Sequence, residues 1–421
     1  MNRTYLLLIF TFLRLVGISQ ESVTLELCRE RAQENYPLSK QNEFLPASHD
    51  LKIKNLNKNF FPQMSINGQA HYQSDVTKTP VNVPGISIPV VSKDQYKLYL
   101  DVSQTIYDGW STNRQKALED VNLKIDMQNI CIDLFKLKER VNQIYFSILL
   151  LKEKAIILEL YRATLSSKLG DVESGVRNGI LLTSNLYILQ AELIKADQAL
   201  TENRISLGAS LSMMNEFTGL SLKESTDFVI PEITVDLGRF TNNRPEFLLF
   251  SLQQEKISAS KKLTGSTLLP RLSAFGQAGY GRPGFDMLKD EFDDFYMIGA
   301  RVNWKFLDWN RTRRDRGVLD LQNHIILSNR ETYDMNVKID LENKTAEIRK
   351  AEELISRDKE LIVLREKISK AVSSQLDNGV ITLSQYLTEI NAETGAKIDL
   401  EMHKIQLIKA KVDYQAALGN F

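Results

Sequence analysis

The sequence predicts a mainly α-helical protein with a smaller β component, in which a unit of two amphipathic strands and long coiled-coil helices is duplicated. Three observations support this fold class. Residues 110–169 and 318–378 contain neither Gly nor Pro, the common helix breakers, so each run predicts a very long helix. Short segments of alternating polarity precede both runs, and the same landmarks recur in both halves. A helix of about 60 residues extends about 90 Å, which is more than a compact domain needs.

Composition limits the classes of function. Lys+Arg and Asp+Glu both number 53, so the formal net charge is zero, and no basic stripe indicates a nucleic-acid partner. Apolar residues make up 43% of the chain, which permits a core. The two cysteines, Cys28 and Cys131, are too few for a disulfide framework or a structural metal site.

The N-terminal residues 1–20 predict a secretory signal peptide. Arg3 supplies positive charge, residues 5–16 are mostly apolar, and small residues follow at 17–19. The alternative for this segment is an N-terminal helix of the core. No later run of 18 apolar residues occurs, so no transmembrane helix is predicted, and only a β-barrel could span a membrane.

The two halves of the chain align with each other. Residues 61–72 match residues 269–280, at an offset of 208, and Asn178-Gly179 matches Asn378-Gly379, at an offset of 200. The offset changes between the matched strands, where the first half has the longer loop. This pattern predicts a duplicated unit rather than a solenoid of short repeats. The predicted organisation is a first repeat at 21–220, a linker at 221–240 and a second repeat at 241–421.

Four segments predict strands, because polar and apolar residues alternate along them. Each has about the length that a tilted strand needs to cross a bilayer, and aromatic residues lie near the ends, as in an interfacial girdle. The alternative is an ordinary hairpin packed on a soluble core. The apolar positions are Met64, Ile66, Ala70 and Tyr72; Tyr96, Leu98, Leu100 and Val102; Leu272, Ala274, Ala278 and Tyr280; and Tyr296, Ile298, Ala300, Val302 and Trp304.

The long helices carry coiled-coil seams. The first seam steps by three and four residues, the spacing of a left-handed supercoil, and the second shows the same period less completely. The first comprises Leu134, Leu137, Val141, Ile144, Ile148, Leu151, Ala155 and Leu158, and the second comprises Leu354, Leu361, Leu364, Ile368 and Ala371.

Four strands cannot close a membrane barrel, and an open sheet edge cannot face lipid. The strand count therefore predicts an oligomer, without fixing its number of subunits. Three copies would supply 12 strands, a plausible channel size.

The residues resemble the TolC-like outer membrane efflux protein family over nearly the whole mature chain. Asn35-Tyr36-Pro37 is similar to the end of the family's opening helix, and Asp108-Gly109 belongs to a segment similar to its strand-to-helix signature. Trp309 departs from the family pattern, which has Gly after the aspartate. The other similar segments are Phe61-Pro62-Gln63, Leu269-Pro270-Arg271, the two Asn-Gly segments and Ala417-Leu418-Gly419.

The resemblance implies a homotrimer with a 12-stranded outer membrane β-barrel continued by a periplasmic α-helical barrel. It implies outer membrane lipid around the barrel and a periplasmic adaptor (membrane fusion) protein at the helical tips. An inner-membrane pump or ABC exporter would drive transport through a passive exit duct for small molecules. Two other functions stay open: the outer membrane component of a type I protein secretion system, and a coiled-coil scaffold outside any membrane.

Two groups of candidate site residues lie at the ends of the long helices. We expect the tips to contact the adaptor, with four apolar side chains (Ile180, Leu181, Val380 and Ile381) exposed as anchors, although these four could instead only staple the hairpins. A charge ring at a narrow mouth tunes ion passage, so charged and polar residues near the tips are candidates for the pore entrance. The tip residues are Asn178, Gly179, Ile180, Leu181, Leu182, Asn378, Gly379, Val380, Ile381 and Thr382, and the pore-entrance residues are Asp171, Arg177, Gln375 and Asp377.

No motif predicts an enzyme or a cofactor. The four histidines are scattered, and the sequence has no HExxH, GxSxG, P-loop or CxxC motif. Asp108 and Asp308 recur at equivalent positions before the long helices. Capping of the helix N-terminus explains this recurrence better than a catalytic pair does.

Overall fold

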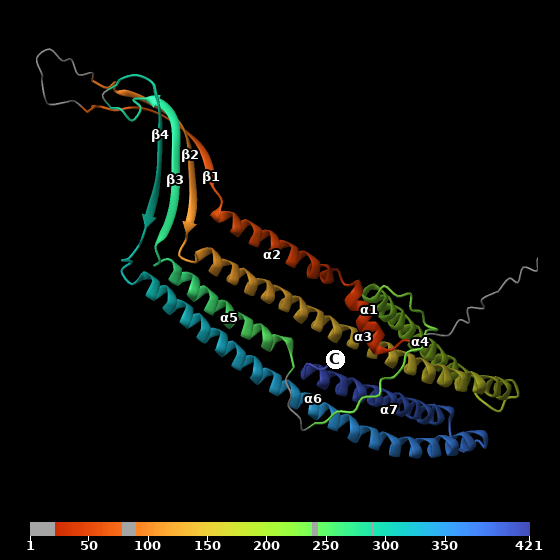
Figure 1. Ribbon diagram of the computed structural model, residues 1–421. Helices are drawn as coiled ribbons and strands as arrows, with labels where there is room; N and C mark the ends of the chain where they lie inside the picture. The colour runs from red at the N-terminus through yellow and green to blue at the C-terminus, as the bar shows by residue number, and fades with distance from the viewer. Residues whose placement is uncertain (1–21, 78–89, 238–242, 288) are drawn as a thin grey trace, which may run out of the picture. The chain divides into compact units, whose positions relative to one another are not determined.

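The computed structural model of the chain describes residues 22–77, 90–237, 243–287 and 289–421 (Figure 1). It is mostly helical, with one small antiparallel sheet. The elements follow the chain in this order: α1 (Leu25–Asn35), the 3₁₀ turn η1 (Pro37–Lys40), α2 (Gln41–Asn57), the 3₁₀ turn η2 (Lys58–Phe60), β1 (Gln63–Tyr72), β2 (Asp94–Tyr107), α3 (Ser111–Arg177), α4 (Thr183–Thr218), α5 (Pro245–Ser266), β3 (Arg271–Arg282), β4 (Asp293–Asn303), α6 (Arg311–Asp377) and α7 (Leu383–Ala417).

Contacts divide the chain into two compact units. The sheet unit comprises the described residues of 40–132 and 245–335, and the hairpin unit comprises those of 22–39, 133–244 and 336–421. Each unit takes segments from both predicted repeats. The repeat boundaries proposed from the sequence therefore stay a prediction, and the proposed signal peptide lies outside the described residues.

The sheet of the sheet unit has the strand order β1-β2-β3-β4, with every neighbouring pair antiparallel. Figure 1 shows the four strands side by side in this order. Gln63 pairs with Ser103, and Arg271 pairs with Asn303. Between β2 and β3 the register shifts at Thr105/Tyr107, a bulge that the alternating pattern did not predict.

The register confirms the predicted faces of the strands. Leu98 lies opposite Gly68 on one side and Tyr280 on the other, and Tyr280 is on the same face as Tyr296. The apolar positions predicted on β1 to β4 therefore share one face of the sheet, which we call the apolar face, except Trp304, which follows the end of β4. The opposite, polar face carries Ser65, Asn67, Gln69 and His71 of β1, Lys97, Tyr99, Asp101 and Ser103 of β2, Ser273, Phe275 and Gln277 of β3, and Phe295, Met297, Arg301 and Asn303 of β4.

Four helical segments lie in a row in the sheet unit. Helix α2, the first part of α3, α5 and the first part of α6 are neighbours in that order (Figure 1). Polar pairs link successive members. They are Lys52 Nζ with Glu119 Oε2 at 3.2 Å, Lys124 Nζ with Glu255 Oε1 at 3.0 Å, and Gln254 Nε2 with Asn323 Oδ1 at 3.5 Å.

Each long helix starts at a corner with a left-handed backbone. The Thr112 N–H donates to Asp108 Oδ2 at 2.6 Å and the Thr312 N–H donates to Asp308 Oδ2 at 2.8 Å, so both aspartates occupy the predicted capping position. Gly109 has φ +69°, and Trp309 has φ +54°, a conformation that side chains other than Gly rarely adopt.

The hairpin unit contains the helical hairpins α3–α4 and α6–α7. The first predicted seam is buried there: Leu137, Val141 and Ile148 of α3 belong to a core that also includes Cys28 of α1. The Tyr145 hydroxyl ties this core to chain segments beside α3, because it bonds the Val23 and Val229 carbonyls at 2.8 and 2.6 Å.

Most of the second predicted seam is exposed in the single chain. Leu361, Leu364 and Ile368 are exposed, whereas Leu341 and Ile348 of the same helix are buried. The sequence gives the period of an apolar stripe but does not say whether its partner lies in the same chain. The stripe on α6 is therefore uncovered in the single chain.

Both long helices are longer than the runs free of Gly and Pro. Helix α3 continues through Gly170 and Gly175, and α6 includes Gly317. A single Gly costs only about 1 kcal/mol in a helix interior, so the neighbouring turns carry the helix past it. Helices α3 and α6 have 67 residues each and begin at Ser111 and Arg311, 200 positions apart. Within the described ranges, no helix is both long and apolar enough to cross a membrane.

Candidate functional site

The first helical tip is a tight turn between α3 and α4. Gly179 has φ +70°, and the Ile180 N–H reaches back to the Gly175 carbonyl at 2.8 Å. A left-handed Gly followed by this long backward bond is the Schellman arrangement that satisfies the last carbonyls of a helix. The predicted reversal at Asn178-Gly179 thus has a direct backbone cause.

The second tip repeats this backbone between α6 and α7. Gly379 has φ +71°, and the Val380 N–H donates to the Gln375 carbonyl at 2.8 Å. The Asn378 side-chain amide adds a bond to the Ser374 carbonyl at 2.7 Å. Thr382 and Gln385 then form a capping box that begins α7, whereas Leu182 at the equivalent first-tip position offers no side-chain cap.

The four apolar tip residues expected to be exposed separate into two pairs. Ile180 is 77% exposed and Val380 is 71% exposed, as an anchor for a partner would be. Leu181 and Ile381 are partly buried and pack against a core cluster that includes Leu383, so for these two the expectation of exposure was wrong. A tight turn alternates its side chains between the hairpin and solvent, and local sequence does not show which side each one takes. Leu182, whose side chain is 74% exposed, enlarges the apolar surface of the first tip.

Two of the four pore-entrance candidates, Asp171 and Asp377, contact the same lysine, Lys168. Lys168 Nζ lies 2.8 Å from Asp377 Oδ1 and 3.4 Å from Asp171 Oδ2, so one ammonium serves carboxylates on α3 and α6. The hydrogen bond to Asp377 raises the pKa of Lys168. Sequence analysis did not identify Lys168. Its spacing of three residues from Asp171 was a local signal, but the contact with Asp377 spans 209 positions and had none.

The other two candidates, Arg177 and Gln375, are exposed at the ends of α3 and α6. The Gln375 carbonyl accepts the tip hydrogen bond from Val380. Their assignment to the pore entrance stays a prediction.

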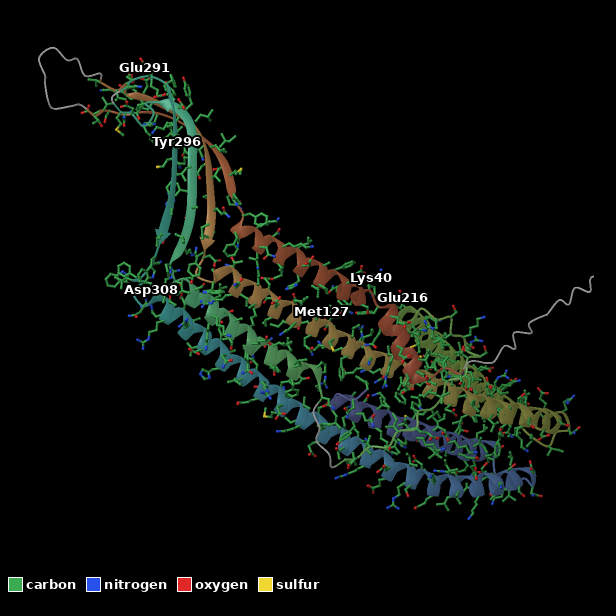
Figure 2. All side chains as sticks on the ribbon, in the orientation of Figure 1. Lys40, Met127, Glu216, Glu291, Tyr296 and Asp308 are labelled. Atoms are coloured by element: carbon green, nitrogen blue, oxygen red, sulfur yellow. The ribbon has the colours of Figure 1, made fainter. Side chains whose placement is uncertain are left out.

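The sheet supplies the second candidate surface. Ile298 and Tyr296 of the apolar face are 83% and 77% exposed, and the large side chains of this face on β1 and β2 are exposed as well. Figure 2 labels Tyr296 on β4 and Asp308 beyond the helix-ward end of the same strand. The polar face instead contains hydrogen-bonded side chains, such as Gln277 Nε2 with Asp101 Oδ1 at 2.7 Å. A sheet with one face apolar and solvent-exposed and the other polar has the distribution of a wall between lipid and water.

The described side chains show structural pairings at the positions first considered for chemistry. Asp108 and Asp308 accept capping bonds at separate helix starts. His403 Nδ1 lies 2.6 Å from Asp358 Oδ2, within the α6–α7 hairpin. No group of three or more His, Cys, Asp or Glu side chains in the described part of the chain is placed to hold a metal ion.

Comparison with known proteins identifies the fold through solved structures. No protein-family model matches the sequence, and no curated protein matches it. The channel CusC has a TM-score of 0.73 with this chain at 11% sequence identity, over 94% of this chain and 92% of that chain. VceC, an outer membrane protein of Vibrio cholerae, has a TM-score of 0.70 at 11% identity, over 94% and 96%. The Campylobacter jejuni outer membrane channel CmeC has a TM-score of 0.70 at 14% identity, over 94% and 85%.

These matches confirm the predicted resemblance to TolC-like outer membrane efflux channels at the level of fold. The structural neighbours are channel proteins rather than enzymes. Because the likeness covers most of both chains, it concerns the whole architecture of strands and long helices rather than one shared motif.

Proposed function

We propose that this chain is an outer membrane channel, the passive exit duct of a tripartite efflux pump that exports small molecules. An inner-membrane pump or ABC exporter would supply the energy, and a periplasmic adaptor protein would join it to the helical tips. The observation that carries the proposal is the exposed apolar face of the sheet, on a fold shared with known outer membrane channels.

The apolar face has a physical need for lipid. Monomeric soluble proteins rarely expose a contiguous apolar patch of more than a few hundred Å², and this face continues across all four strands. Each Å² of apolar surface removed from water contributes about 25 cal/mol, so moving several large side chains into hydrocarbon is strongly favourable. A soluble scaffold would need another surface to cover these side chains.

The edges of the sheet require further copies of the chain. Strands β1 and β4 are the two ends of the strand order, so each has one hydrogen-bonded neighbour among the described residues. Unpaired backbone groups cannot face lipid. We propose a homotrimer, in which β4 of one subunit pairs with β1 of the next and 12 strands close a barrel.

The exposed stripe on α6 supports the same assembly. Val318, Leu321 and Ile325 are exposed at spacings of three and four residues, and Leu361, Leu364 and Ile368 repeat that spacing further along. This spacing is that of a coiled-coil seam. In the proposed trimer, helices of neighbouring subunits cover the stripe and form a periplasmic α-helical barrel.

The tips are the proposed contact with the adaptor. Ile180, Leu182 and Val380 present exposed apolar side chains on turns whose backbone is fixed by a left-handed Gly. Rigid turns lose little conformational entropy on binding, which favours their use as anchors.

Fractionation of a Gram-negative host that expresses the full chain tests the proposal. We expect the protein in the outer membrane fraction as a trimer that dissociates only on heating, with its helices accessible to protease from the periplasm. A monomer that stays soluble without detergent would contradict both the membrane location and the closed barrel.

A further inference from the structure

A cavity of about 840 Å³ lies in the sheet unit, on the polar face of the sheet beside the start of α3. Four cationic side chains line it: Lys58 of η2, Arg271 at the start of β3, Arg301 of β4, and Lys305, which follows β4. We call these four residues the cationic cluster. Three of them come from the second predicted repeat.

The register places the two arginines close together on one face. Arg271 pairs with Asn303 and Ser273 pairs with Arg301, so Arg271 and Arg301 are diagonal neighbours. Such neighbours lie about 7–8 Å apart, within reach of long side chains. The Arg301 guanidinium carbon lies 5.0 Å from the centre of the Phe275 ring, and this stacking holds the arginine over the polar face.

Two aspartates lie near the cluster: Asp108 lines the cavity, and Asp308 interacts electrostatically with Lys305. None of the four cations forms a salt bridge with a carboxylate of the described chain. Asp108 also lines the cavity, but its Oδ2 accepts the Thr112 N–H at 2.6 Å and caps α3. Asp308 Oδ2 likewise accepts the Thr312 N–H at 2.8 Å and caps α6. Four cations against two capping aspartates leave the cluster with excess positive charge, and a bound anion would offset the repulsion among the cations.

The neutral side chains around the cavity suit an anion as well. Asn303 lines it and carries an amide N–H₂ donor. Gln63 also lines the cavity, but its Nε2 already donates to the Lys58 and Phe61 carbonyls at 3.3 Å. Arginine presents a planar fork of donors that matches phosphate and carboxylate oxygens. The cavity thus combines positive charge, directional donors and enough volume for a small multivalent anion.

We propose that the cationic cluster is a binding site for small, multiply charged anions, such as polyphosphates. The proposal rests on the proposed channel function, because the polar face lines the lumen only if the apolar face meets lipid. Each subunit of the trimer then contributes one cluster at the helix-ward end of its strands, the end beyond which Asp308 is labelled in Figure 2. Rings of Arg and Lys favour anion passage in other pores, and low-dielectric walls concentrate the field of such a ring.

The test is block of single-channel current by tripolyphosphate. The full-length protein is reconstituted in a planar lipid bilayer, and tripolyphosphate is added on the side of the strand-connecting loops. We expect block of the wild type that weakens as KCl is raised, because salt screens the attraction. In the variant R271Q/R301Q/K305Q, the apparent affinity should fall at least about tenfold, since each charge near an anion in water contributes up to about fivefold.

The control variant is K97Q. Lys97 is a cation of the same polar face, but it lies opposite Gln69 and Gly281 and outside the cavity. The apparent affinity of tripolyphosphate for K97Q should stay within about twofold of that for the wild type. Equal weakening in K97Q and the triple variant would overturn the site in favour of a general charge effect.

The single variants R271Q and K305Q keep the contact between Arg301 and Phe275, and they test the site if the triple variant assembles poorly. Each should weaken block about two- to fivefold. If tripolyphosphate blocks both variants as strongly as the wild type, this inference is refuted, but the proposed channel function is not. A wild-type protein without conductance would instead refute the channel function, and the inference with it.

Discussion

The two repeats of this chain share a backbone and differ in surface chemistry. Helices α3 and α6 have the same length, both are capped by an aspartate, and both end on a Gly with φ near +70°. By contrast, the polar face carries Gln63, Asp101 and Thr105 in the first repeat where the second has Arg271, Arg301 and Lys305. The capping aspartates and the tip glycines are therefore the same in both copies, whereas the residues that set the charge of the polar face differ.

The two repeats also differ at single positions in the tips and at the starts of the long helices. Thr382 caps α7 where Leu182 leaves α4 without a side-chain cap. Trp309 adopts a left-handed conformation where the first repeat has Gly109. Substitutions at these equivalent positions test which residues each repeat requires.

The largest effect is expected on the apolar face, where the repeats agree in polarity. In I298K, a lysine would face lipid at a position equivalent to Leu98. Charged residues at the bilayer midplane cost about 2–4 kcal/mol in such barrels. We expect the heat-dissociable trimer in outer membranes to fall at least about tenfold.

The matched control for I298K is M297K, which gives the second repeat the lysine that the first repeat already has at Lys97 on the polar face. Normal assembly is expected of M297K. Equal assembly of the two variants would contradict the assignment of the faces.

The next effect concerns the tips. In G379V, a β-branched residue would have to adopt φ near +71°, which is strongly disfavoured. Pump-dependent export, measured as resistance to an exported compound, should be abolished while the trimer still assembles, and G179V should act in the same way. G317A, inside α6 where an added Cβ meets no atom within 4 Å, should be neutral. Normal export by G379V would refute the role of the tips.

Substitutions at the left-handed residues before α3 and α6 should change the stability of the trimer by different amounts. G109A places a Cβ 2.8 Å from the Leu269 Cβ on a left-handed backbone, which should cost about 1–3 kcal/mol. In W309G, relief of the left-handed strain is offset by the entropy of Gly, so the change should stay within about 1 kcal/mol. Thermal dissociation of the trimer measures both changes, and equal losses would argue against this account of the corners.

The smallest effect concerns the start of α7. Loss of the capping box in T382A should cost about 1 kcal/mol, and L182T should gain a few tenths to about 1 kcal/mol by adding the missing cap. Hydrogen exchange of the amides in the first turns of α4 and α7 reports these changes. Slower exchange at α7 in T382A would show that the box does not stabilise this helix.

Much of the fold could be predicted from local patterns. Alternation located the four strands and their faces, because the period of two fixes the side on which each residue lies. The bulge at Thr105/Tyr107 had no such signal. The stripe on α6 was recognisable by its period, but a period does not say which surface covers it, so its exposure in the single chain could not be predicted.

Some features of the candidate site could be predicted from local sequence and others could not. The left-handed glycines of the tips follow from the Asn-Gly pairs, whereas the inward turn of Leu181 and Ile381 depends on packing between distant helices. The ion pair of Lys168 with Asp377 and the cationic cluster unite residues that are remote in sequence. Such groupings arise from strand register and helix pairing, and neither is encoded in a short window.

The two thiols of the chain lie in very different surroundings. Both cysteines are free, with Cys28 buried in the core and Cys131 exposed on α3. Burial raises the pKa of the Cys28 thiol to about 12, which suppresses the reactive thiolate at neutral pH. A maleimide dye applied to the folded chain should consequently attach at Cys131 alone. Each subunit would then carry a single fluorophore without any mutagenesis, and stepwise photobleaching of one particle would count its copies directly.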